Sequence, residues 1–203
     1  MKKSLKKKPL LIVGSGGHFK SCIDIIEESK IFYVYGLISK YDKIGKKIYG
    51  YEVLSQSDDY KKFFNLGVKN AFIAVGQIQN ANIRKKIFIK LKKNLFNLPS
   101  FISASSSVSK NVTIQEGTIV HKNCYIGRDV KIGKCNIINS AAVIEHDCKV
   151  GDFCHLSTST TVNGNVEIGS ETFIGSGSVL SNNIKIKKKT FIKMLSRVVN
   201  SIK

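Results

Sequence analysis

The second half of the chain places an aliphatic residue at every sixth position. From Ile102 to Val198, all seventeen positions at this spacing are Ile, Leu or Val, and no insertion interrupts the series. A period of six fits neither an α-helix nor a half-buried strand. It predicts a triangular solenoid in which one hexapeptide forms one side and three hexapeptides form one coil.

Two further positions of the hexapeptide support this register. The fourth residue after the aliphatic one is small in most repeats, as at Cys124, Ala142 and Thr160, which suits a corner of the prism. The residue directly after the aliphatic one is glycine in five repeats, and we expect it to relieve the other tight turn. The aliphatic residues then point inward and stack on their counterparts one coil away, about 4.8 Å along the axis.

The first half of the chain lacks the six-residue period and predicts an α/β domain. A buried strand at 9–13 is followed by the glycine turn 14–18 and then by an amphipathic helix at 21–30. Strand, turn, helix and strand form a βαβ unit with a parallel sheet. Further strands are expected at 33–38 and 71–76, and further helices at 58–64 and 82–93. We therefore predict an α/β domain over residues 1–98 and the solenoid over residues 99–203.

Composition restricts the functional class. Lys+Arg outnumber Asp+Glu by 33 to 14, a formal charge of +19, but only three of the basic residues are arginine. This argues against dedicated nucleic-acid binding, because specific readers depend on arginine forks, and it favours anionic small molecules or weak association with an anionic membrane. No apolar run reaches the roughly 18–20 residues of a membrane span. Five cysteines without a CxxC pair indicate a reducing compartment, so we expect a cytoplasmic protein.

The candidate chemistry lies in the run Glu145-His146-Asp147. His146 comes two places after the inward Ile144 and is expected on the outside of the prism. A neighbouring carboxylate can fix the tautomer of an imidazole and raise its basicity, as a general base requires. Gly164 lies one coil above His146, where its N–H could stabilise an oxyanion. His121 is expected to be a surface residue.

Two other patterns have a possible binding role. His146, Cys148, Cys154 and His155 could be read as a metal site, but the cysteines occupy successive sides of the prism and zinc needs convergent ligands, so no metal is predicted. The turn Gly14-Ser15-Gly16-Gly17-His18 has Phe19 in place of the third glycine of a dinucleotide fingerprint. It favours binding of a nucleotide or sugar phosphate over that of a full dinucleotide, and the alternative is a tight turn with no ligand.

These features together resemble a known family. The hexads, the stretch 12–18 and the run 140–157 are similar to the left-handed β-helix (hexapeptide-repeat) sugar acetyltransferases, which include sialic acid O-acetyltransferases and UDP-bacillosamine-type N-acetyltransferases. The resemblance covers nearly the whole chain. It implies a Rossmann-like α/β domain before a left-handed parallel β-helix. It also implies a homotrimer with active sites between subunits and acetyl-coenzyme A as the co-substrate, bound along the groove between adjacent β-helices.

The resemblance also implies roles for individual residues. The general base matches His146, its acidic partner matches Asp147, and the oxyanion glycine matches Gly164. On the substrate side we expect Asn139 and Glu145, together with the glycine turn that would hold the nucleotide sugar: Gly14, Ser15, Gly16, Gly17 and His18. Coenzyme A is expected to contact His155, Gly164 and Gly175.

The predicted activity is N-acetylation of a UDP-linked 4-amino sugar, a precursor of a bacterial surface glycan, by direct transfer. O-acetylation of sialic acid or a related nonulosonate is the alternative within the class, because one histidine could serve either acceptor. A third interpretation is an inactive solenoid scaffold of the same pathway. It depends on the sequence ending at Lys203, where family members usually continue into a loop and a Pro-Ala-Lys segment that helps to enclose coenzyme A.

Overall fold

The computed structural model describes residues 7–203, and the chain divides into two compact units. The first unit comprises the chain up to Gly76 together with Ile83–Pro99, and the second comprises Gln77–Asn82 together with Ser100–Lys203. The sequence interpretation placed the boundary after residue 98, and the long segment of the second unit begins at Ser100. The assignment of Gln77–Asn82 to the solenoid unit was not predicted. The first six residues of the predicted α/β domain lie outside the described part.

The first unit contains a five-stranded sheet in the order β3-β4-β2-β1-β5. Strand β1 (Lys8–Val13) pairs in parallel with both β2 (Phe32–Ile38) and β5 (Asn70–Ile73), as the βαβ pattern predicts. The apolar run of β1 is fully buried at Leu10, Leu11 and Ile12. The helices are α1 (Gly17–Glu27), α2 (Tyr60–Asn65) and α3 (Asn82–Lys93).

A hairpin at the edge of this sheet was not predicted. Strand β4 (Tyr51–Ser55) pairs in parallel with β2, and β3 (Lys47–Ile48) pairs with β4 in the antiparallel direction, so the sheet is mixed rather than wholly parallel. The two strands are short, and the turn between them contains Tyr49, a bulky residue with a positive φ of 50°. Neither feature gives a clear sequence signal, because tyrosine seldom adopts a left-handed conformation.

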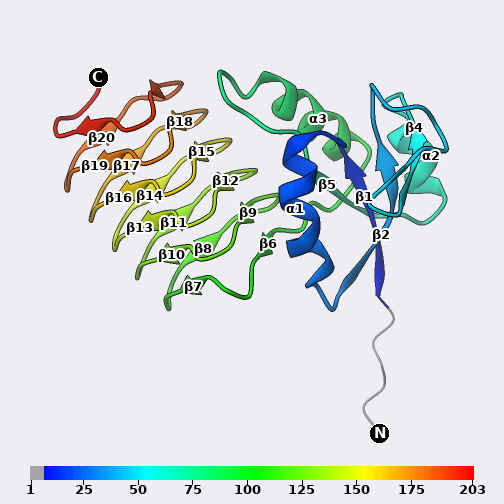
Figure 1. The fold of residues 1–203 in the computed structure, drawn as a ribbon, viewed down its shortest axis with the longest axis horizontal. Helices are drawn as coiled ribbons and strands as arrows, with labels where there is room; N and C mark the ends of the chain where they lie inside the picture. The colour runs from blue at the N-terminus through cyan, green and yellow to red at the C-terminus, as the bar shows by residue number, and fades with distance from the viewer. Residues whose placement is uncertain (1–6) are drawn as a thin grey trace, which may run out of the picture. The chain divides into compact units, whose positions relative to one another are not determined.

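The second unit is the predicted prism of hexapeptide sides (Figure 1). Each of its seventeen two-residue strands ends on one aliphatic residue of the six-residue series. Each strand pairs in parallel with the strand one coil away, as in the register Ile126↔Ile144↔Val162. The strands form three sheets, which we call the first, second and third faces.

The first face comprises β6 (Phe101–Ile102), β9 (Ile119–Val120), β12 (Ile137–Ile138), β15 (His155–Leu156), β18 (Phe173–Ile174) and β21 (Phe191–Ile192). The second face comprises β7 (Ser107–Val108), β10 (Tyr125–Ile126), β13 (Val143–Ile144), β16 (Thr161–Val162), β19 (Val179–Leu180) and β22 (Arg197–Val198). The third face comprises β8 (Thr113–Ile114), β11 (Lys131–Ile132), β14 (Lys149–Val150), β17 (Glu167–Ile168) and β20 (Lys185–Ile186). Corners 1, 2 and 3 are the turns that follow the strands of the first, second and third face, respectively.

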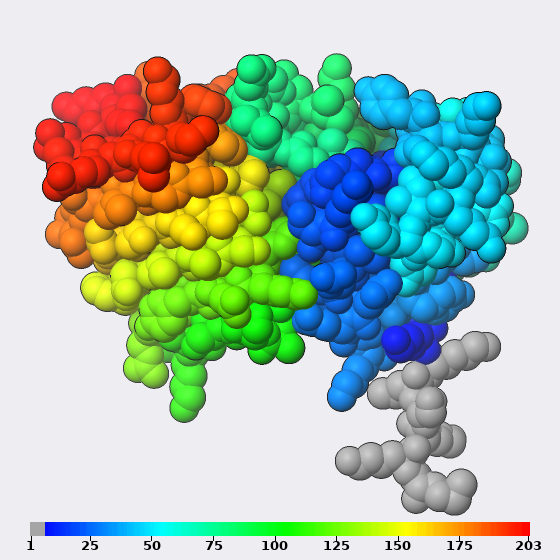
Figure 2. All heavy atoms as spheres, viewed as in Figure 1, coloured from blue at the N-terminus to red at the C-terminus, as the bar shows by residue number. Residues whose placement is uncertain are grey.

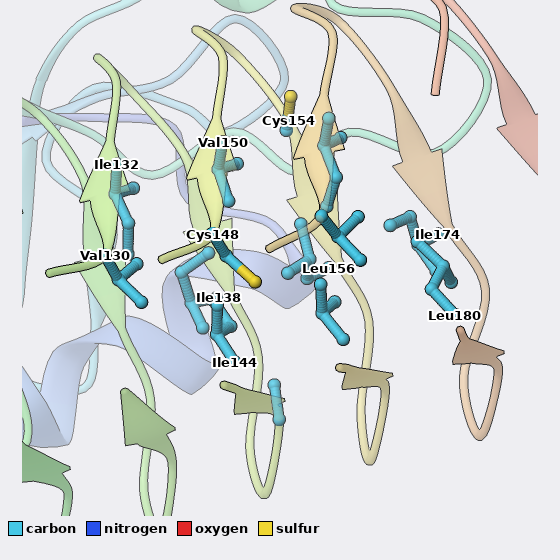
Figure 3. Packing of buried hydrophobic residues seen from close by; sticks show 14 of the residues in the cluster. Val130, Ile132, Ile138, Ile144, Cys148, Val150, Cys154, Leu156, Ile174 and Leu180 are labelled. Atoms are coloured by element: carbon cyan, nitrogen blue, oxygen red, sulfur yellow. The ribbon is translucent and has the colours of Figure 1, made fainter. Parts of the chain in front are cut away.

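The aliphatic residues fill the interior of the prism. Ile144, Leu156 and Leu180 are completely buried, and side chains from neighbouring coils point toward one another in Figure 3. Burying one such side chain stabilises the fold by about 1.5–3 kcal/mol. Figure 2 shows the coils as successive bands of colour without gaps between them. The stack forms a continuous support for the turns at its corners.

The role predicted for the glycines of the repeat is wrong in detail. In the turns from Asn111 to Leu195, the left-handed residue is the third after the inward aliphatic residue, as at Asn123 (φ 59°) and Asp129 (φ 61°). The glycines directly after the aliphatic residue do not have a positive φ. They are required because the next coil approaches too closely: a Cβ at Gly169 would lie 2.4 Å from the backbone nitrogen of Lys188.

The corners are filled differently. Small residues occupy the buried position of corners 1 and 3, as predicted, for example Ala142 and Thr172, and the exception is Asn136. Corner 2 is filled by larger aliphatic side chains, namely Val112, Val130, Val166, Ile184 and Ile202, and the exception is Cys148. This aliphatic column lies inside the turns that contain His146 and Gly164. Among residues 7–203, no helix has the length and apolar character needed to cross a membrane.

Candidate active site

His146 belongs to a column of residues along corner 2. Each member is the second residue after an inward aliphatic residue, and each lies one coil from the next. Backbone hydrogen bonds join the turns: Asp147 N–H donates to Arg128 O at 3.0 Å, and Asn165 N–H donates to His146 O at 2.9 Å. We call this set the His146 column, and in chain order it contains Lys110, Arg128, His146, Gly164, Asn182 and Asn200.

The imidazole of His146 is held by the next residue. Its Nδ1 lies 2.8 Å from Oδ2 of Asp147, and the two side chains are 62% and 58% exposed. Asp147 occupies the left-handed turn position, with a φ of 62°. With Nδ1–H donating to this carboxylate, the neutral ring carries its lone pair on Nε2. The sequence prediction that His146 lies on the outside of the prism beside a carboxylate is confirmed.

Gly164 lies against the other side of the ring. A Cβ at position 164 would lie 2.6 Å from Nε2 and 2.7 Å from Cε1 of His146, so no residue with a side chain fits there without displacing the ring. Among the described residues, the Gly164 N–H has no hydrogen-bond acceptor, whereas its carbonyl accepts from Asn183 N–H at 3.0 Å. The basic nitrogen and an N–H without an acceptor therefore lie on neighbouring coils.

The coil beneath His146 contributes residues that the sequence interpretation did not select. Gly127 permits close approach of the turn above it, because a Cβ there would lie 2.7 Å from His146 N. Arg128 follows and is exposed. Glu145, a predicted substrate residue, is half-buried at the start of the His146 turn, and its N–H donates to Val162 O at 2.8 Å. Reading the sequence in steps of eighteen residues downward from His146 would have found Arg128.

The structure places a second group of predicted residues elsewhere on the prism. Asn139 and Gly175 both lie at corner 1, two coils apart, and Asn139 Oδ1 accepts from Ser140 N–H at 2.8 Å. The second face separates corner 1 from corner 2. Within one chain, Asn139 and Gly175 therefore do not join His146 and Gly164.

His155 lies on the first face, which is opposite corner 2. It is only 8% exposed, its Nδ1 makes a hydrogen bond with the Gln77 carbonyl, and the edge of Phe173 packs against it at 5.2 Å between ring centroids. Gln77 Nε2 in turn donates to Phe153 O at 2.6 Å, so the segment beginning at Gln77 covers this part of the face. His155 is thus a buried residue of the first face and does not contact His146.

The prediction that His121 is a surface residue is wrong. It is 2% exposed, and burial, with a smaller contribution from the charge of His155, lowers its pKa to about 4. A signal was present in the sequence: the outward positions of the first face are mostly apolar, for example Phe101, Ile119 and Ile137, and these are buried as well. An outward apolar row indicates that a face is covered.

The cysteines do not take part in this chemistry. Cys148 lies inside corner 2 and Cys154 inside corner 3, where their thiols contact the carbonyls of Asn163 and Gly169. Burial raises the pKa of both thiols, that of Cys154 to about 12. Cys148, Cys154, His146 and His155 therefore do not converge on one point.

The predicted glycine turn forms one wall of a cleft of about 610 Å³ in the first unit. Gly14 has a φ of 111°, and a Cβ there would lie 2.8 Å from Cγ2 of Val75. Gly16 caps α1 without a side-chain hydrogen bond, and the first turn of the helix has no acidic residue. An N-terminus of this kind attracts anions, since its first N–H groups lack helical partners.

The glycine turn is joined to the loop after β2 by a polar group that the sequence did not reveal. Ser15 Oγ lies 2.6 Å from both Asp42 Oδ2 and Ser39 Oγ, and Lys46 Nζ donates to Asp42 Oδ1 at 2.6 Å. The hydrogen bond from Lys46, and then those from Ser15 and Ser39, lower the pKa of Asp42 to about 2. The basic side chains Lys40, Lys86 and Lys90 also line this cleft, and Lys90 pairs with Asp58.

A buried arginine fixes the segment at the end of β5, which also lines the cleft. Arg84, 1% exposed, donates from Nη1 to Ile73 O at 3.0 Å and to Val75 O at 2.6 Å. These bonds fix the chain at the end of β5, where it passes Gly14. Contacts between distant segments, not local sequence, build this cleft.

Comparisons with known proteins agree with this architecture. Residues 9–91 match the family model of the PglD N-terminal domain, and no curated protein sequence matches the chain. PerB from Caulobacter crescentus, solved with CoA and GDP-perosamine, is similar with a TM-score of 0.88 and 27% identity, covering 98% of this chain and 92% of that one. A mutant perosamine N-acetyltransferase from Caulobacter crescentus, also with CoA and GDP-perosamine, gives a TM-score of 0.89 at 26% identity with the same coverage.

A third structure supports the fold. The acetyltransferase domain of PglB from Neisseria gonorrhoeae FA1090 has a TM-score of 0.88 at 22% identity, covering 97% of this chain and 94% of that one. The predicted combination of an α/β domain with a left-handed β-helix is confirmed. The resemblance read from the sequence is thereby confirmed as well: this chain has the architecture of the hexapeptide-repeat sugar acetyltransferases and falls in the acyltransferase class.

Proposed function

We propose that this chain transfers the acetyl group of acetyl-coenzyme A to the amine of a nucleotide-linked 4-amino sugar. The observation that carries the proposal is the arrangement at corner 2, where Nε2 of His146 lies beside Gly164 while Asp147 holds Nδ1. A base and an oxyanion donor one coil apart are the two groups that acyl transfer to an amine requires. The similarity to PerB at 27% identity supports an amino sugar as the acceptor.

The residues would act in sequence. Acetyl-coenzyme A supplies an activated thioester. His146 Nε2 accepts a proton from the acceptor amine as its nitrogen attacks the thioester carbon, and Asp147 stabilises the imidazolium that forms. The Gly164 N–H donates to the carbonyl oxygen, on which negative charge develops. The proton then passes from His146 to the departing thiolate, which returns the imidazole to its neutral form.

The cleft of the first unit would bind the nucleotide. The N-terminus of α1 at Gly16 and Gly17 suits the phosphate next to the nucleoside, and Lys86 and Lys90 lie along the same cleft. UDP is the nucleotide that the sequence resemblance implies, whereas PerB is named with GDP-perosamine. Both nucleotides therefore belong in the acceptor panel.

The separation of the predicted site residues supports assembly into a homotrimer. Asn139, His155 and Gly175 lie at corner 1 or on the first face, and His146 and Gly164 lie at corner 2. A second copy of the chain could bring corner 1 against corner 2 and complete one site from two subunits, with coenzyme A between them. Trimerisation, a cytoplasmic location and weak association with anionic membranes stay predictions.

The test is thiol release from acetyl-coenzyme A in the presence of UDP- and GDP-linked 4-amino sugars and of free sialic acids. We expect turnover on an amino sugar, and we expect His146→Ala to lower kcat at least a hundredfold without a change in Tm. Turnover on sialic acid alone would replace N-acetylation by O-acetylation. The absence of both turnover and calorimetric binding of acetyl-coenzyme A would favour the inactive scaffold.

A further inference from the structure

The charge of the side chains in the His146 column changes along its length. On the N-terminal side of the imidazole it carries two cations, Arg128 one coil away and Lys110 two coils away. On the C-terminal side it carries Gly164 and then the neutral amides Asn182 and Asn200. If Gly164 receives the thioester oxygen, the acceptor approaches His146 from the side of Arg128. The two sides of the base therefore differ in charge.

Arg128 is available to bind a ligand. Its side chain is exposed, and within residues 7–203 its guanidinium makes neither a hydrogen bond nor an ion pair. Its backbone position is fixed, since its carbonyl accepts from Asp147 N–H at 3.0 Å. The residue is thus anchored to the turn of His146 while its five donors stay open.

Arginine is also rare in this chain. Of the 33 basic residues only three are arginine, which leaves thirty lysines. Arg84 is buried against backbone carbonyls, and Arg197 lies on the second face in its last strand. Arg128 alone of the three stands at corner 2. A guanidinium presents a planar fork that matches a carboxylate or a phosphate, which the point charge of lysine does not.

The surroundings of His146 make such a cation necessary for an anionic acceptor. Glu145 and Asp147 flank the imidazole, and Asp129 follows Arg128 on the coil beneath. These three carboxylates repel a negatively charged ligand from the base. Lys149, on the next side of the prism, is paired with Glu167 at 3.0 Å. Arg128 is the cation nearest to His146 along the column.

We propose that Arg128 is a specificity-determining residue that binds an oxyanion group of the acceptor and so orients its amine or hydroxyl toward His146 Nε2. The inference rests on the proposed acetyl transfer. The oxyanion is either the phosphate next to the sugar of a nucleotide-linked acceptor or the carboxylate of a nonulosonate. Both groups present two oxygens that can accept the two parallel N–H bonds of a guanidinium fork.

The experiment compares Arg128→Gln and Arg128→Lys with a matched control, Lys134→Gln. Lys134 occupies the same hexapeptide position at corner 3, so its removal changes the net charge equally. The acceptors are a UDP-4-amino sugar, N-acetylneuraminic acid and the methyl glycoside of the same 4-amino sugar, which has the amine without a phosphate. Steady-state kinetics gives kcat and KM for each.

We expect Arg128→Gln to raise KM for the charged acceptor about ten- to hundredfold, with kcat within about threefold of wild type. Arg128→Lys is expected to recover part of this loss, and KM for the methyl glycoside and for acetyl-coenzyme A is expected to stay unchanged. The acceptor whose KM responds identifies phosphate or carboxylate as the group. Equal losses on the charged acceptor and on the methyl glycoside, or an equal loss in Lys134→Gln, would overturn the proposal.

Equilibrium binding separates this inference from the proposed function. Calorimetric titration with the UDP-4-amino sugar and with N-acetylneuraminic acid requires no turnover. Weaker binding to Arg128→Gln than to wild type would support the role of Arg128 even where no acceptor is acetylated, in which case the acetyltransferase proposal alone fails. Binding that is unaffected by the substitution, or no binding of either compound to wild type, would refute the role of Arg128.

Discussion

Gly164 lies so close to the imidazole of His146 that a methyl group added at position 164 is expected to lower activity without lowering stability. A Cβ at position 164 would stand 2.6 Å from Nε2, whereas real Cβ contacts stay beyond about 3 Å. The ring is 62% exposed on its own turn and can rotate away. Gly164→Ala is therefore expected to move the base and leave the coil intact.

For this variant we expect a loss of about a hundredfold in kcat, because displacements near 1 Å have that effect, and a Tm within about 2 °C of wild type. The matched control is Gly169→Ala, whose Cβ would meet the backbone nitrogen of Lys188 at 2.4 Å. Backbone cannot rotate away, so this variant is expected to lower Tm by several degrees. A stable and fully active Gly164→Ala would show that the ring position is not critical.

Asp147→Asn tests the contact between the carboxylate and the imidazole. Asparagine keeps the size of the side chain and tolerates the left-handed φ of 62°, so the turn is expected to be preserved. Loss of the negative charge at 2.8 Å from Nδ1 removes the stabilisation of the imidazolium, and we expect kcat to fall about ten- to hundredfold. Asp129→Asn is the control.

Asp129 has the same hexapeptide position one coil below, with a φ of 61°. Its substitution is expected to change kcat by less than about twofold. Similar losses in both variants would mean that the general field of corner 2, rather than the contact with Nδ1, supports the base.

Two glycines of the cleft in the first unit are expected to respond in opposite ways. A Cβ on Gly16 would have no heavy atom within 4 Å, and the φ of this residue is not positive, so Gly16→Ala adds a methyl group only to the cleft. We expect an unchanged Tm and at least tenfold weaker binding of UDP or GDP, measured by calorimetry, because the phosphate next to the nucleoside must approach this backbone closely. Nucleotide binding equal to wild type would place this phosphate elsewhere.

Gly14→Ala is the counterpart of that variant. It combines a φ of 111° with a Cβ contact of 2.8 Å to Val75, so it is expected to destabilise the first unit by about 1–3 kcal/mol. Thermal unfolding measures this directly. A Tm equal to wild type would mean that the chain near Val75 can move to accommodate the added methyl group.

The sequence was sufficient for the prism because one rule repeats. Every inward residue, the place of every turn along the chain and the stacking of Gly164 on His146 follow from steps of six and eighteen residues, so one correct register predicts them all. The first unit has no such rule. The contact of Ser15 with Asp42 joins segments 27 residues apart, and no sequence feature of either segment predicts this contact.

The repeat also misled where spacing alone was used. Glycine after the aliphatic residue suggested a turn, but the left-handed turn residue lies two places later, at positions such as Asp147. Glycine is required directly after the aliphatic residue because a Cβ there would clash with the next coil. Exposure was misjudged at His121 because the period says which residues point outward and not which faces are covered. Hydropathy of the outward positions supplies that second piece of information.

The burial of His121 predicts acid sensitivity of the fold. Its pKa is lowered from 6.5 to about 4 in the folded chain, so between these values the unfolded state binds more protons than the folded state. The free energy of unfolding therefore falls as the pH is lowered through this range, by at most about 3–4 kcal/mol for one such group. Urea unfolding midpoints at pH 7 and pH 4.5 measure the effect.

We expect His121→Gln to reduce the difference between these two midpoints, whatever its effect at neutral pH, because glutamine does not titrate. The control is Asn182→Gln, an exposed substitution in the His146 column that removes no titratable group and is expected to leave the difference unchanged. If His121→Gln keeps the full difference, the acid sensitivity arises from other groups, and the protonation of His121 is not what opposes folding at low pH.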